Sequence, residues 1–285
     1  LFPGAGAGIV ARYNLGRGSG AASRLTATVK ALSPVFPVFM SYYDDNPLGS
    51  ITLENGEDFA VHDIKVTLMS GQFMSQPKLC ATIESLASGG RVDVPLYALF
   101  GDDILSVTAN TSLPATVAVE YRVLGSLRRL ELPLELGLFH RNAMNWLDDR
   151  RAAAFVSATD PAVLWFSRST ASVVGERMRD GISRNLQIAM GLFEAERLFG
   201  MNYVVDPASS YVENAGNESS VDYLQYPSQT LFFRGGDCDD LSILYCSILQ
   251  SLGIETAFIT IPGHIYMAFR LDMDSSEAKS TFSDP

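Results

Sequence analysis

The sequence is poor in cationic side chains, histidine and cysteine. Lysine and arginine number 21 against 32 aspartates and glutamates, which gives a formal charge of −11, and no run of basic residues occurs. Because nucleic-acid binding depends on clustered cations, this composition argues against a nucleic-acid partner. The three histidines and three cysteines, without a CxxC pair, exclude a Cys/His zinc site and a closed disulfide framework. We therefore expect no metal and no cofactor.

Long apolar runs are also missing. No stretch approaches the roughly 18 consecutive apolar residues of a membrane-spanning helix, so we expect no transmembrane segment. Hydrophobic residues nevertheless make up 47% of the 285 residues, which is enough for a buried core and for two domains. The chain begins at Leu1 and ends at Asp284-Pro285, and we expect it to be a fragment.

The first 31 residues are rich in glycine and alanine, as in PGAGAG and GRGSGAAS, and have no clear hydrophobic period. Such a composition is typical of a leader or linker. Residues 1–31 are therefore predicted to lie outside the folded domains.

From 32 to 141 the apolar residues recur at every second position. Alternation of this kind is typical of strands with one buried face. The clearest runs are 50–54, 63–68, 115–123 and 130–138, with turn residues at Asn55-Gly56 and Gly89-Gly90. Several such strands without intervening helices predict an antiparallel β-sandwich of the immunoglobulin-like kind over 32–141. The prediction rests on the pattern alone, because a Cys-Trp-Cys framework is absent.

After residue 141 the period becomes helical, so residues 142–285 are predicted to form a second, α+β domain. Asp160-Pro161 is a typical helix start. A second helix is predicted to end at Gly200 and to bury a stripe of Leu186, Ala189, Met190 and Phe193. A third helix, 238–252, has an apolar stripe of Leu241, Leu244, Tyr245, Ile248, Leu249 and Leu252. Two strands, 256–261 and 264–271, are predicted to follow.

Cys238 stands in RGGDCDDLS, where the third helix begins. The partial positive charge of a helix N-terminus favours thiolate, so we expect a lowered pKa for this thiol. His264 opens a strand 26 residues later, and strand parity places it with Tyr266 on the face opposite Ile265. A helix-borne cysteine facing a strand-borne histidine suits thiol catalysis, with His264 as base and then acid.

Several residues around this pair have both a functional and an ordinary interpretation. Gly236 permits close approach of a substrate backbone, and Gln229 is either an oxyanion donor or an exposed loop amide. The acidic flanks of Cys238 are interpreted as a polar, surface-facing segment whose carboxylates cap the helix and oppose thiolate formation, rather than as a metal site: Asp237, Asp239 and Asp240. The remaining cysteines and histidines are predicted to be structural: Cys80, Cys246, His62 and His140.

The segment RGGDCDDLSILYCSILQSLGIETAFITIPGHIYMAF resembles the core of the transglutaminase-like superfamily. The resemblance implies a papain-like Cys-His-Asp triad that acts on amide bonds of a protein or peptide through a thioester. The outcome would be hydrolysis, as in a cysteine peptidase or amidase, or transfer to an amine. Tyr266 stands where the family often has tryptophan. The third triad member would be Asp284 or a residue beyond Pro285, with the C-terminal part of the domain missing.

The same resemblance implies a bacterial protein outside the cytoplasm, in the periplasm or cell envelope, because such cores often follow an immunoglobulin-like sandwich there. The alternative is a catalytically inactive binding or scaffold protein that uses the β-sandwich for contacts. The sequence leaves the oligomeric state open.

Overall fold

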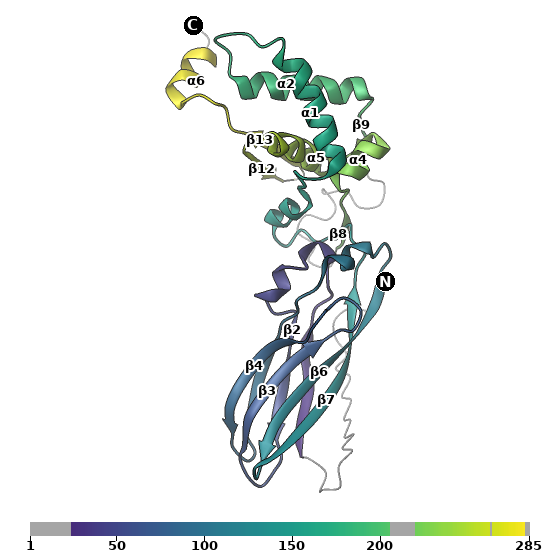
Figure 1. Cartoon of the computed structure of the whole chain (residues 1–285), viewed down its shortest axis with the longest axis vertical. Coiled ribbons are helices and arrows are strands. Elements are labelled where there is room, and N and C mark those ends of the chain that lie inside the picture. The colour runs from purple at the N-terminus through teal and green to yellow at the C-terminus, as the bar shows by residue number, and fades with distance from the viewer. Residues whose placement is uncertain (1–23, 206–219, 263, 283–285) are drawn as a thin grey trace. The chain divides into compact units, whose positions relative to one another are not determined.

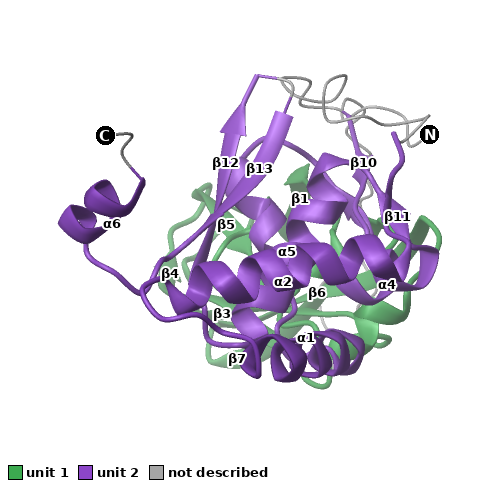
Figure 2. Cartoon of the chain, turned by 90° about the horizontal axis from the view of Figure 1, so that it is seen from above, with its two compact units in different colours: residues 1–141 green, residues 142–285 purple. Residues whose placement is uncertain are grey.

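The computed structural model describes residues 24–205, 220–262 and 264–282. The chain divides into two compact units, Leu1–Arg141 and Asn142–Pro285 (Figures 1 and 2). The division falls where the hydrophobic period changes from two to helical, and the described chain combines β-sheets with helices.

Unit 1 consists of two antiparallel sheets. The first has the order β1-β2-β5 and the second the order β4-β3-β6-β7. Their strands are β1 (Leu25–Leu32), β2 (Gly49–Asn55), β3 (Val61–Met69), β4 (Lys78–Leu86), β5 (Arg91–Leu96), β6 (Thr111–Val123) and β7 (Ser126–Leu138). Three short 3-10 helices lie in the connections: Pro37–Phe39, Tyr42–Asp44 and Asp102–Ser106.

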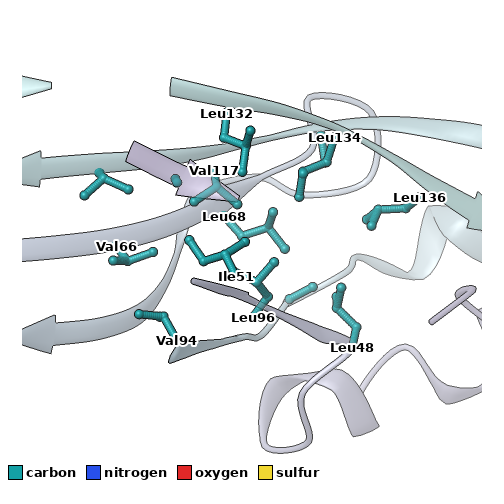
Figure 3. Packing of buried hydrophobic residues seen from close by; sticks show 14 of the residues in the cluster. Leu48, Ile51, Val66, Leu68, Val94, Leu96, Val117, Leu132, Leu134 and Leu136 are labelled. Atoms are coloured by element: carbon teal, nitrogen blue, oxygen red, sulfur yellow. The ribbon is translucent and has the colours of Figure 1, made fainter. Parts of the chain in front are cut away.

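Alternate residues of both sheets form one apolar core, as Figure 3 shows. Ile51 of β2, Val66 of β3 and Val117 of β6 are completely buried in it. The predicted strands at 115–123 and 130–138 are confirmed, since they lie within β6 and β7.

The prediction of a leader over residues 1–31 is wrong for its last part. Residues from Leu25 onward form β1, which pairs with β2 over its length. Leu25 and Ala27 are buried. The period of two was present, but alanine and threonine carried much of it and gave a weak signal. Residues 1–23 lie outside the described part of the chain.

Unit 2 contains helices and short strand pairings. Its helices are α1 (Pro161–Gly175), α2 (Arg184–Phe199), α4 (Pro227–Phe233), α5 (Cys238–Ser251), α6 (Ser275–Phe282) and the 3-10 helix Asp149–Phe155. Its strands are β8 (Ala143–Met144), β9 (Asn202–Tyr203), β10 (Asp222–Tyr223), β11 (Gly235–Gly236), β12 (Thr256–Ile261) and β13 (His264–Phe269). Strand β10 pairs with β8, β11 with β9 and β12 with β13. None of the helices in the described ranges has the length and apolarity needed to cross a membrane.

Helix α1 begins as the sequence predicts. Asp160 is the N-cap and accepts from the Ala162 amide, and Pro161 occupies the first turn. Helix α2 ends at Gly200, which has φ of +89°.

The predicted buried face of α2 is partly wrong. Met190 and Phe193 are 62% and 66% exposed, whereas Ile188 and Leu192 are buried with Ala189. Both stripes satisfy the helical period, and the packing of α2 against α1 decides between them. The chosen face also buries Glu196.

Helix α5 lies at the centre of unit 2. Side chains all round it are buried, including Ile243, Leu244 and Cys246, so it is a core helix rather than one with a single apolar stripe. It packs against α1 and against the hairpin of β12 and β13 (Figure 2). Gly253 follows it with φ of +78°, as expected for the residue after a helix end.

Candidate functional site

The segment before Cys238 is held by a short parallel pairing. Gly235 and Gly236 of β11 lie opposite Asn202 and Tyr203 of β9. The Val204 amide donates to the Gly236 carbonyl over 2.9 Å. A Cβ atom on Gly236 would lie 2.5 Å from the Asp240 Cβ, so only glycine fits there without movement. The glycines thus bring β9 and the start of α5 close together.

Cys238 is the first residue of α5, and its half-buried thiol lies against β13. The backbone N–H of Ile265 donates to the sulfur, as do the amides of Cys238 itself and Asp239. Burial nevertheless raises the pKa of the Cys238 thiol above its ordinary value, and the charge of Asp237 adds to this effect. The expected lowering of this pKa is therefore wrong, because desolvation and a neighbouring carboxylate outweigh the helix start.

His264 opens β13, one residue before the amide that contacts the thiol. Its exposed ring stacks on Tyr266, with the ring centroids 5.9 Å apart and the planes at 26°. Ile265, between them, is completely buried. The predicted strand parity is confirmed. The structure thus brings Cys238 and His264 to neighbouring positions on α5 and β13.

The acidic residues that flank Cys238 are buried, so their interpretation as a surface-facing segment is wrong. Asp237, Asp239 and Asp240 are 5%, 2% and 5% exposed. Asp237 occupies the N-cap position, but its side chain does not cap the helix. Asp239 accepts from the Asp240 amide over 2.7 Å. Sequence polarity alone could not predict this, because burial depends on partners elsewhere in the chain.

Burial changes the protonation of this group, which we call the carboxyl cluster: Asp237, Asp239, Asp240 and Asp222. Desolvation, with a hydrogen bond to Asp237, raises the pKa of Asp239 far above its ordinary range. Asp239 is therefore a neutral acid that shares its proton with Asp237. Burial also raises the pKa of Asp240 to about 7.

Gln225 and Trp146, which carry no sequence signal, supply the polar contacts of the carboxyl cluster. The Gln225 amide and side chain donate to the two carboxylate oxygens of Asp240 over 2.7 and 2.6 Å. The indole of Trp146 donates to Asp222 over 2.7 Å. Neither residue belongs to a motif, so sequence reasoning missed both.

Three members of the cluster have the donor chemistry of a hard cation site. Asp237, Asp239 and Asp240 each bring a ligand oxygen within 4.8 Å of the others. Proton sharing and the donors from Gln225 account for the oxygens of Asp239 and Asp240, so the cluster is explained as a hydrogen-bonded network.

The other predicted site residues have structural contacts. The Gln229 carbonyl oxygen accepts from Asn142 over 2.7 Å and from the Tyr226 amide over 2.9 Å, at the start of α4. Cys246 is buried as predicted, and Cys80 of β4 is half-buried beside Tyr97. His62 lies on β3 of unit 1, and burial lowers the pKa of His140.

Asp284, the predicted third triad residue, lies outside the described residues. Asp272, which follows β13, accepts from the Ser183 hydroxyl and from the Arg184 amide at the start of α2. Asp274 accepts from Ser276 and Glu277 at the start of α6. Both carboxylates therefore stabilise helix starts.

Tyr203 is a further residue that sequence reasoning missed. It lies on β9, opposite Gly236, and its side chain forms a hydrogen bond with Cys238. The two residues are far apart in sequence, so the pairing of β9 with β11 is needed to bring them together.

Comparisons with known proteins assign no family to the chain. No family model matches it. No curated protein matches it either. Among solved structures, a solution structure of a putative late embryogenesis abundant protein matches 41% of this chain and 72% of its own, at 9% identity and a TM-score of 0.27.

Proposed function

We propose that the chain performs thiol-dependent amide chemistry through a thioester on Cys238, with His264 as the general base and then the general acid. The observation that supports this most is the position of the Cys238 thiol. It lies at the start of a buried helix and against the β13 amide next to His264. The proposal carries with it a transglutaminase-like core in unit 2 and an immunoglobulin-like sandwich in unit 1.

The raised pKa of Cys238 defines the first step. The resting residue is a thiol, so its proton must leave as the sulfur attacks. His264 takes that proton, the C–S bond forms, and the carbonyl electron pair moves to oxygen. The backbone amides of Cys238 and Asp239, at the helix start, are donors for this oxyanion.

Collapse of the oxyanion breaks the C–N bond, and His264 returns the proton to the leaving amine. The thioester then reacts with water in an amidase or peptidase, or with a second amine in an acyl transferase. A protein or peptide outside the bacterial cytoplasm is the proposed substrate. The carboxylate that orients His264 is proposed to be Asp284 or a residue after Pro285.

The test compares this chain with a longer one that continues past Pro285. Peptide hydrolysis and incorporation of a fluorescent amine into casein would be measured for each. We expect Cys238→Ala and His264→Ala to abolish turnover, and Cys80→Ala, a thiol in unit 1, to leave it unchanged. Thiol-independent turnover, or no turnover by the longer chain on either substrate, would favour the inactive binding or scaffold protein.

A further inference from the structure

Strand β9 lies closer to the Cys238 segment than most side chains would allow. The Asn202 amide donates to the Arg234 carbonyl over 3.0 Å, and the Val204 amide donates to the Gly236 carbonyl over 2.9 Å. A Cβ atom on Gly235 would lie 3.1 Å from Val204 Cγ2 and 3.2 Å from the Asn202 carbonyl oxygen. The pairing therefore fixes Tyr203, between these two contacts, beside the start of α5.

The side chain of Tyr203 has an unusual combination of contact and exposure. It is 60% exposed, yet it forms a hydrogen bond with the Cys238 thiol. The sulfur thus has donors on two sides, the Ile265 amide of β13 and the phenol of β9. A phenol O–H that reaches the sulfur and remains open to solvent can also reach a group bound to that sulfur.

We infer that the Tyr203 hydroxyl is a catalytic hydrogen-bond donor, first to the Cys238 sulfur and then to the oxyanion formed when that sulfur attacks an amide or ester carbonyl. This inference rests on the proposed function. The hydroxyl only donates a hydrogen bond and keeps its proton throughout, because His264 carries the proton from sulfur to the leaving group.

The charges around Tyr203 support a donor rather than a base. Partial desolvation, together with Cys238 and Asp237, raises the pKa of Tyr203 above its ordinary value, so the phenol stays protonated at neutral pH. Once the thiol has lost its proton, the phenol O–H can only donate to it. Asp237 and Asp239 face the same hydroxyl. As acceptors they cannot stabilise an oxyanion, which leaves Tyr203 as the side-chain donor on this flank.

The experiment replaces only the hydroxyl, with Tyr203→Phe in the full chain. Tyr42→Phe is the matched control, since Tyr42 is an exposed tyrosine of unit 1. Two reactions of Cys238 are measured by mass spectrometry of the labelled peptide. Alkylation by iodoacetamide across pH 6–10 reports on the thiolate, and acylation by p-nitrophenyl acetate also passes through an oxyanion.

We expect Tyr203→Phe to slow acylation by about 100-fold, as for loss of one oxyanion donor, and to slow alkylation much less. The alkylation profile should move to higher pH, because the thiolate loses a donor. Unchanged rates in both reactions would overturn the inference. Faster rates in both would also overturn it, because Tyr203 would then be a cover over the thiol.

The proposed function can fail separately. If the wild-type chain is alkylated at Cys238 but is not acylated, the proposed thioester chemistry and the oxyanion part of the inference are both refuted. The alkylation profile of Tyr203→Phe then decides on the contact with sulfur. A wild-type chain that is acylated at the same rate as Tyr203→Phe refutes the inference alone.

Discussion

Glu196 gives unit 2 a pH-dependent stability that can be calculated from the structure. It lies on the buried face of α2, is 9% exposed, and its Oε1 atom has no hydrogen-bond partner among the described residues. Burial raises the pKa of Glu196 from 4.5 to about 8. The folded state therefore keeps a proton that the unfolded chain loses above about pH 4.5.

The sign and size of the effect follow directly. The contribution of Glu196 to stability is complete below about pH 4.5 and falls as the pH rises to about 8. At about 1.4 kcal/mol per pKa unit, the loss reaches about 5 kcal/mol. Glu196→Gln keeps the shape of the side chain and cannot ionise. We expect the variant to gain stability relative to the wild type as the pH rises from 5 to 8.5.

The assay is urea unfolding followed by tryptophan fluorescence. Both tryptophans of the chain, Trp146 and Trp165, lie in unit 2, so the signal reports on that unit alone. The difference between variant and wild type isolates Glu196 from other titrating groups, such as Asp240. Glu194→Gln is the matched control on the same helix, because Glu194 is exposed and paired with Arg197. A difference between Glu196→Gln and wild type that does not change with pH would refute the reasoning.

Two further predictions concern the segment around the thiol. Gly236→Ala forces a Cβ atom to within 2.5 Å of Asp240 Cβ, so we expect a loss of about 1–3 kcal/mol in urea unfolding of unit 2. Gly175→Ala should cost less, because no atom lies within 4 Å of the place its Cβ would take, and equal losses would contradict the steric argument. Iodoacetamide should label Cys238 faster than Cys246, because Cys246 is 1% exposed and burial raises its pKa to about 11. Faster labelling of Cys246 in the folded chain, measured by peptide mass spectrometry, would show that α5 is not a stable core helix.

The strands and helix ends could be predicted because their signals are local. Alternation at 115–123 places every second side chain on one face whatever the rest of the chain does. The helix start at Asp160-Pro161 and the end at Gly200 depend on groups within one turn. Strand β1 could not be predicted in the same way, because alanine and threonine in LTATVKAL weaken the alternation.

The faces of α2 and the burial of the carboxyl cluster could not be predicted, because both depend on distant partners. Two helical stripes of α2 have the required period, and only packing against α1 selects the one with Ile188 and Leu192. Asp240 is buried because Gln225, 15 residues earlier, provides both of its donors. A local sequence pattern contains neither contact.

The buried acids also explain why the candidate nucleophile is a thiol at rest. A carboxylate beside the sulfur makes a second negative charge there costly, and burial removes the water that would screen it. Protonation of Asp239 limits the number of charges in the cluster, but Asp237 remains next to Cys238 in sequence and acts on its sulfur. Negative charge on the sulfur is therefore favoured only when its proton moves to a base and donors face the sulfur at the same time. The neighbouring positions of His264, the Ile265 amide and Tyr203 provide both conditions on the two flanks of one atom.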